Sequence, residues 1–236
     1  MGVYENWSAE LEKCANPEKV KILSSFFKTG KGEYGEGDIF IGLTVPQNRA
    51  VAKKYCNSPF AEIQKMLDSP IHEFRLSALL ALVEKFGKDK TAQKAVVEFY
   101  LKNTKHINNW DLVDLTCCKI LGVYTMDGHR EILDRLSGSS DFWEQRIAIV
   151  STLPHIKKGD FSLTLKYAEK YLNHTEPLIH KATGWLLREV GKKDESALLD
   201  FLDGHAERMP RTALRYSIER LSPELKKHYM SIKKRV

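Results

Sequence analysis

The amino-acid sequence predicts an all-α fold, built as a solenoid of stacked helical hairpins. Apolar residues recur three and four positions apart along most of the 236 residues, and alternating strand patterns are almost absent. Proline often follows a capping residue where such a stretch begins, and glycine often lies where one ends. Similar segments also recur at multiples of about 35 residues, as expected for a repeat protein.

Each predicted helix is bounded by these signals. The start signals are Asn16-Pro17, Ser58-Pro59, Ser69-Pro70, Ser140-Asp141 and Ser222-Pro223, and the stop signals are Gly87, Gly138, Gly159 and Gly191. In chain order, the predicted helices span residues 4–15, 17–28, 46–57, 59–67, 71–86, 90–102, 110–121, 130–136, 142–155, 161–172, 177–190, 195–205, 211–221 and 223–232.

Length and composition predict one soluble domain over residues 1–236. A glycine-rich loop at 29–38 interrupts it, and a basic helix or tail at 222–236 ends it. The sequence has no apolar stretch long enough for a membrane helix and no secretory signal, and its four cysteines form no CxxC pair. We therefore expect a cytoplasmic protein, acting as a monomer. The net charge of +6 suggests a polyanionic partner only if the positive charges are clustered.

Three similar segments carry a basic residue at one shared position. They superpose Arg75, Arg146 and Lys181, which are separated by 71 and then 35 residues. Equivalent helices of a solenoid form one continuous concave surface, so these residues predict a positive stripe suited to a polyanion. The alternative is that each is an ordinary solvated surface charge.

The repeat between Arg75 and Arg146 departs from this pattern. Trp110 and Asp114 take the place of the expected cation, and their spacing puts them on one helix face. Lys181, Trp185 and Arg188 are expected to share a face in a later repeat. The alternative is that the tryptophans belong to the core and the carboxylates favour the helix start.

At these residues the chain resembles the AlkD-like DNA alkylation repair glycosylases, whose fold is a superhelix of HEAT-like repeats. The resemblance implies excision of positively charged N3- or N7-alkylated purines from duplex DNA, without flipping the base into a pocket. It covers most of the chain and is carried by Asn16-Pro17-Glu18-Lys19, GLTVPQNR from Gly42 to Arg49, WDLVD from Trp110 to Asp114, WEQR from Trp143 to Arg146, and GWLLRE from Gly184 to Glu189.

The resemblance also assigns roles to single residues. It implies a catalytic set of Asp114, Trp110 and Trp185, and DNA contacts from Arg146, supported by Lys181, Arg188 and Arg75. Phe26 replaces an expected aromatic hydroxyl, Thr44 replaces a longer polar side chain, and loop 29–38 looks like an insertion. These departures concern substrate range and rate.

A cationic purine leaves without being protonated, so one carboxylate can suffice where glycoside hydrolysis usually needs two. Asp114 would stabilise the oxocarbenium-like sugar and position water, while the tryptophans hold the sugar and the lesion. Asp111 could be a second acid, although support of the helix start is the preferred interpretation. No metal or cofactor is predicted.

Two other function classes remain open. One is a non-catalytic HEAT-repeat protein that binds branched or damaged DNA, and the other is a protein–protein scaffold. The Trp110, Asp114 and Trp185 set favours the enzyme, and the basic stripe counts against the scaffold. Steeply salt-dependent DNA binding would separate the scaffold from the others. The resemblance and the absence of targeting signals suggest a bacterial protein, associated with the nucleoid when bound to DNA.

Overall fold

The prediction of an all-α fold is confirmed. The computed structural model describes residues 2–233, which form α-helices and short 3-10 turns, with one isolated bridge between Ile39 and Ile71 as the only strand-like pairing in that range. The chain divides into two compact units, Met1–Thr116 and Cys117–Val236. None of the helices in the described range is both long and apolar enough to cross a membrane.

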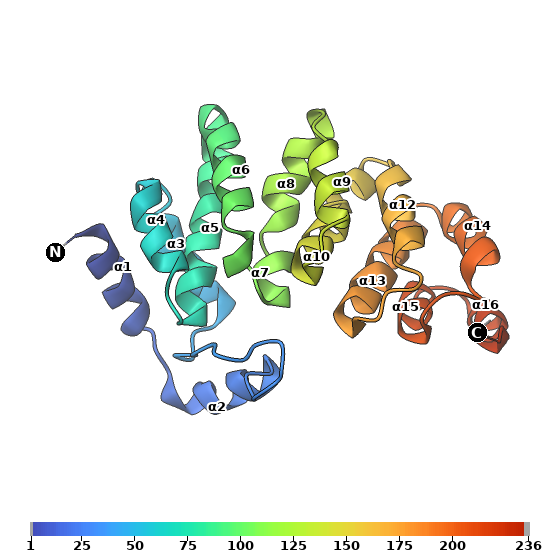
Figure 1. Cartoon of the computed structure of the whole chain (residues 1–236), viewed down its shortest axis with the longest axis horizontal. Coiled ribbons are helices and arrows are strands. Elements are labelled where there is room, and N and C mark those ends of the chain that lie inside the picture. Colours follow the sequence, from blue (N-terminus) through green and yellow to red (C-terminus); the bar gives the residue numbers. More distant parts are fainter. Residues whose placement is uncertain (1, 234–236) are drawn as a thin grey trace. The chain divides into compact units, whose positions relative to one another are not determined.

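The first unit is organised around one long, almost fully buried helix, α5. Helices α3, α4 and α6 pack against it, and α7 contacts it (Figure 1). The elements of this unit are α1 (Val3–Glu12), α2 (Pro17–Phe26), α3 (Val45–Lys54), α4 (Phe60–Leu67), α5 (His72–Lys88), α6 (Gln93–Lys102) and α7 (Trp110–Asp114), with 3-10 turns at Lys90–Ala92 and Thr104–His106.

The second unit has an equivalent central helix, α13, against which α10, α12, α14 and α15 pack. Its elements are α8 (Cys117–Tyr124), α9 (Glu131–Ser137), α10 (Phe142–Val150), α11 (Leu153–Lys157), α12 (Ser162–Lys170), α13 (Pro177–Lys193), α14 (Glu195–His205), α15 (Arg211–Ser217) and α16 (Pro223–Ser231), with a 3-10 turn at Thr125–Asp127. Helix α16 occupies most of the predicted basic segment 222–236, of which residues 234–236 lie outside the described range.

Two predicted helices are each divided in two, and both breaks have a local cause. Residues 110–121 form α7 and α8, and at the break the Thr116 hydroxyl donates to the Leu112 carbonyl at 2.5 Å. Such a side-chain bond competes with the helical backbone. Residues 142–155 form α10 and α11, because Pro154 has no N–H and its ring clashes with the carbonyl four residues earlier.

Helix α2, whose last residue Phe26 contacts Trp110, is the least buried α-helix of the first unit. None of its side chains is fully buried, and Ile22 and Phe26 are 69% and 60% exposed. Its start is fixed by the Asn16 N–H, which donates to the Ile41 carbonyl at 2.9 Å. Its end leads into the glycine-rich loop 29–38, in which the Gly35 N–H donates to the Lys28 carbonyl at 3.0 Å. The helix therefore forms a wall that is tied down mainly at its two ends.

Candidate functional site

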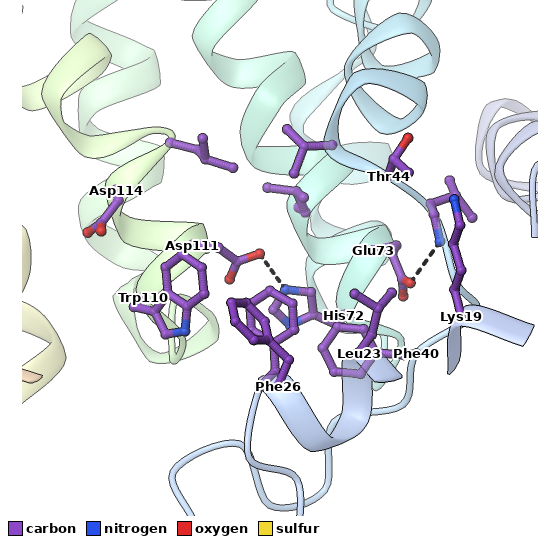
Figure 2. A pocket seen from close by; sticks show the side chains of 15 residues that line it. Lys19, Leu23, Phe26, Phe40, Thr44, His72, Glu73, Trp110, Asp111 and Asp114 are labelled. Atoms are coloured by element: carbon purple, nitrogen blue, oxygen red, sulfur yellow. Dashed lines mark hydrogen bonds and ion pairs between the residues drawn. The ribbon is translucent and has the colours of Figure 1, made fainter. Parts of the chain in front are cut away.

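Trp110 and Asp114 lie together on α7, as the sequence predicts. The Asn109 side chain accepts the Trp110 N–H at 2.8 Å and so begins this short helix. Both residues line a pocket of about 320 Å³ within the first unit (Figure 2). The lining is mainly apolar, and it includes the leucines and phenylalanines Leu23, Phe26, Phe27, Phe40, Leu43, Leu76 and Leu115.

Trp110 is half-buried and packs against the end of α2. Its indole stacks on Phe27, with ring centroids 5.1 Å apart and planes inclined by 17°. Phe26 meets the same indole edge-on at 5.6 Å. Trp110 is thus both a packing residue and part of the accessible pocket lining. Because Phe26 and Thr44 line the same pocket, two of the departures noted in the sequence belong to this site.

A buried ionic network lies beside the pocket and centres on His72, the first residue of α5. His72 is 1% exposed, and its ring nitrogens contact two carboxylates. Nδ1 lies 3.0 Å from Asp38 Oδ2, and Nε2 lies 2.9 Å from Asp111 Oδ2. The Arg75 guanidinium donates to the other oxygen of Asp38 at 2.7 Å. The network therefore joins the end of the glycine-rich loop, α5 and α7. Figure 2 shows the contact between His72 and Asp111.

Electrostatics keep the His72 ring protonated at neutral pH. Burial alone lowers the pKa of His72, but the carboxylates of Asp111 and Asp38 outweigh it and raise that pKa to about 9. Burial raises the pKa of Asp38, yet His72 and Arg75 outweigh that effect and leave it lowered. Both ring nitrogens of His72 therefore donate, each to a carboxylate.

Asp111 is a structural member of this network. It is 4% exposed; one carboxylate oxygen pairs with His72, and the other accepts the Leu112 N–H at 2.8 Å. Of the two interpretations left open by the sequence, these contacts match support of the helix start. Asp114, three residues later, is the less buried of the two carboxylates.

A second buried carboxylate shapes the wall opposite α7. Glu73 Oε1 accepts the backbone N–H groups of Ile41, Gly42 and Leu43 at 2.8–3.2 Å. The Asn48 side chain donates to the Glu73 carbonyl at 2.7 Å. These bonds fix the segment that brings Leu43 and Thr44 to the pocket.

Two of the segments that carry the family resemblance, the one that begins at Asn16 and the one that begins at Gly42, are in direct contact through Gly42. Its φ is +91°, and an added Cβ would lie 2.0 Å from the Asn16 carbonyl oxygen. Only glycine accepts both the backbone conformation and the close approach. The Asn16-Pro17 turn and the segment beginning at Gly42 therefore pack directly on each other.

The three residues of the predicted positive stripe differ in exposure. Arg75 and Arg146 are each 5% exposed, whereas Lys181 is exposed. The buried guanidiniums bind backbone carbonyls: Arg75 donates to Ser69 at 3.1 Å and Arg146 to Leu178 at 2.5 Å. A repeated arginine can thus join neighbouring turns of the protein. From residue type and spacing alone, such a structural arginine looks the same as one that binds a DNA phosphate.

The remaining predicted residues belong to the second unit, on α10 and α13. Trp185 is half-buried on α13, and the neighbouring Gly184 allows α15 to approach, since an added Cβ would lie 2.4 Å from the Ala213 carbonyl oxygen. Arg188 is half-buried, and its guanidinium forms ion pairs with Glu219 and Glu189. Trp185, Arg146, Lys181 and Arg188 are in this unit, whereas Trp110, Asp114 and Arg75 are in the first.

His72 and Asp38 were missed by the sequence prediction. They are 34 residues apart, in no metal or catalytic motif, and Asp38 ends a loop that looks like an insertion. An acidic residue at the end of a glycine-rich loop and a histidine at a helix start are individually common. Only the fold brings them together.

Comparisons with known proteins agree with this architecture. The sequence pattern of the family described as "DNA alkylation repair enzyme" matches residues 7–221, nearly the whole chain. A solved structure described as "Predicted DNA alkylation repair enzyme from Enterococcus faecalis" is similar in fold, with a TM-score of 0.68 and 19% sequence identity. The similarity covers 89% of this chain and 97% of that one. No curated protein sequence matches the chain. On the extent of the family match, the chain belongs to the DNA alkylation repair enzyme family.

Proposed function

We propose that this protein is a DNA glycosylase that excises positively charged N3- or N7-alkylated purines from duplex DNA. The observation that carries the proposal is the pairing of Asp114 with Trp110 on α7, at a largely apolar pocket. Family membership supports a role in DNA alkylation repair. The reaction is hydrolysis of the N-glycosidic bond.

The pocket chemistry supports a carboxylate that acts on a positive charge. A carboxylate beside apolar and aromatic groups interacts more strongly with a cation than one surrounded by water. The indole face of Trp110 adds cation–π attraction of roughly 0.5–2 kcal/mol for a charged lesion. A neutral, undamaged base gains neither interaction, which would give selectivity for alkylated purines.

The proposed reaction needs one carboxylate and one water. The C1′–N bond breaks and its electron pair goes to the purine, which becomes neutral as it departs. Asp114 stabilises the positive charge left on the sugar and accepts a proton from the attacking water, whose oxygen bonds to C1′. A general acid is unnecessary because the leaving base already carries its positive charge.

The resemblance to the AlkD-like glycosylases adds residues of the second unit to the proposal. Trp185 would be the second aromatic contact for the lesion or its sugar. Lys181 is exposed and suited to a DNA phosphate, whereas Arg188 and Arg146 would contact phosphates in addition to their protein partners. Arg75 would act indirectly, because its guanidinium is engaged with Asp38 and Ser69.

The test is single-turnover release of 7-methylguanine and 3-methyladenine from methylated duplex DNA. Asp114→Asn is expected to lose at least about a hundredfold in excision rate, because the charge that stabilises the transition state is removed. Its DNA affinity, measured by fluorescence anisotropy, should stay within about twofold of wild type. Asp200→Asn, at an exposed position of α14, is the matched control and should excise normally.

An unchanged excision rate in Asp114→Asn would overturn the assignment of the carboxylate. Absence of release by wild type, together with salt-sensitive DNA binding, would instead identify a non-catalytic DNA-binding protein. Absence of both release and DNA binding would leave the scaffold interpretation.

A further inference from the structure

We propose that His72 is a positioning residue whose imidazolium ring clamps the glycine-rich loop to α7 and so holds Trp110 and Asp114 in place. The proposal rests on the proposed function, because it concerns how that site is kept in its working geometry. His72 itself, 1% exposed, is assigned no contact with DNA.

Two separate connections lead from His72 to Trp110. The first is the 2.9 Å contact between Nε2 and the carboxylate of Asp111, the residue that follows Trp110. The second runs through aromatic rings: His72 packs against Phe27 at 5.1 Å, and Phe27 stacks on Trp110 at 5.1 Å. The His72 ring also stacks on Phe40 at 4.5 Å, and Phe40 in turn stacks on Phe27 at 5.1 Å. A displacement of the His72 ring would therefore reach Trp110 through both.

The clamp works only when both ring nitrogens carry a proton. Asp38 and Asp111 are acceptors, so each contact needs an N–H from the ring. A neutral imidazole has one N–H and one lone pair, and the lone pair would face a carboxylate oxygen. One of the two contacts is then lost, which weakens the attachment of either the loop, still bound by Arg75, or the start of α7.

The surrounding charges set the conditions for this loss. Asp38 reaches the ring from the loop, Asp111 from α7, and Arg75 from the next turn of α5. Arg75 opposes the positive ring but is itself paired with Asp38. Glu73 and Asp114 also line the pocket, and Glu73 is engaged by backbone N–H groups. The net effect favours the charged ring at neutral pH and its neutralisation as the pH rises above about 9.

The structure suggests a variant that removes the need for the second proton. In the wild type, Asp38 uses one carboxylate oxygen for His72 and the other for Arg75. In Asp38→Asn, the amide Nδ2 can therefore donate to an unprotonated Nδ1 of His72, while Oδ1 still accepts from Arg75. The neutral ring can then donate from Nε2 to Asp111. This variant should keep the clamp closed at alkaline pH, where the wild-type clamp opens.

The experiment compares single-turnover excision at pH 7.5 and pH 10 in wild type and Asp38→Asn, using the same methylated duplex. We expect the wild-type rate to fall about tenfold more than the variant rate across this interval, because small displacements of reacting groups cost rate steeply. Comparing the two proteins at each pH cancels changes in the substrate. Affinity for undamaged duplex should fall equally in both, since the clamp does not contact DNA.

A second measurement does not depend on excision. The ¹⁵N resonances of the His72 ring should report protonation of both nitrogens at pH 7.5, and Trp110 fluorescence should change as the pH passes about 9 in wild type but not in Asp38→Asn. Trp110→Phe identifies the signal of that residue. A neutral His72 ring at pH 7.5, or identical pH responses in the two proteins, would overturn the proposal. If wild type excises nothing, the proposed function fails while these spectra still decide the clamp.

Discussion

The indole of Trp110 and the phenyl ring of Phe27 are stacked, with centroids 5.1 Å apart and planes inclined by 17°. Phe27, which is buried, also stacks on Phe40, so its ring contacts two other aromatic rings. The preceding residue, Phe26, meets Trp110 only by its edge and is 60% exposed. Two adjacent phenylalanines at the end of α2 therefore contribute very differently to the site.

This difference predicts unequal costs of truncation. Phe27→Ala should lower the free energy of unfolding by about 3–4 kcal/mol, because it leaves a cavity between two aromatic rings. Phe26→Ala should cost less than about 1 kcal/mol, since its side chain is largely solvated. Urea denaturation followed by circular dichroism measures both values, and equal costs would contradict the packing.

Gly42 predicts a second contrast between two glycines. Gly42→Ala should destabilise the protein by at least about 2 kcal/mol, because it combines a left-handed backbone with a clash against the Asn16 carbonyl. Gly87→Ala is the matched control: it lies in α5, and an added Cβ there meets no neighbouring atom. That change should stabilise by about 0.5–1 kcal/mol. Thermal melts of the two variants should shift in opposite directions.

The buried His72 predicts a loss of stability at alkaline pH. Its pKa is about 9 in the folded state and about 6.5 when unfolded, so the folded state binds the proton more tightly. The resulting stabilisation is fully present below pH 6.5 and is lost as the pH rises through 9. It amounts to about 3 kcal/mol.

Urea denaturation at pH 6.5 and pH 10 measures this loss. Lysines and tyrosines also titrate in this range, so His72→Gln serves as the reference that carries their contribution but not that of His72. The difference in unfolding free energy between wild type and His72→Gln should shrink as the pH rises. A difference that stays constant from pH 6.5 to 10 would show that His72 is not protonated in the folded state.

Basic residues at one repeat position should fall into two classes. Lys181→Met should reduce the slope of log affinity against log salt concentration by about 0.9 for duplex DNA, if Lys181 neutralises one phosphate. Its effect on unfolding should be small because the side chain is exposed. Arg75→Met should instead cost about 3–5 kcal/mol of stability, because Asp38 loses a buried ionic partner. Salt titrations and urea denaturation of both variants distinguish the classes.

Much of the fold could be predicted because it depends on local patterns. Apolar periodicity and capping residues identified most helices, and WDLVD put Trp110 and Asp114 on one face that borders a pocket. The break after Asp114 escaped prediction because it involves Thr116, whose hydroxyl bonds to the preceding turn and to Tyr100. The periodicity of apolar residues continues unchanged across this break.

Burial of charge was the least predictable property of the site. Arg75, Arg146 and Lys181 look equivalent in sequence, yet only the lysine is exposed, because both arginines meet backbone carbonyls of neighbouring turns. The His72 network likewise depends on contacts spanning 34 and 39 residues. A single sequence carries no signal for such pairs.

The shallow packing of α2 gives the pocket two walls with different tolerance for sequence change. On the α2 side, the exposed Phe26 can be replaced at little cost to folding, so selection can adjust that position freely. On the α5 side, Glu73 and His72 are buried and fully engaged, and most replacements there would disrupt the unit. We therefore expect related proteins to diverge in substrate preference through α2 while retaining the α5 wall.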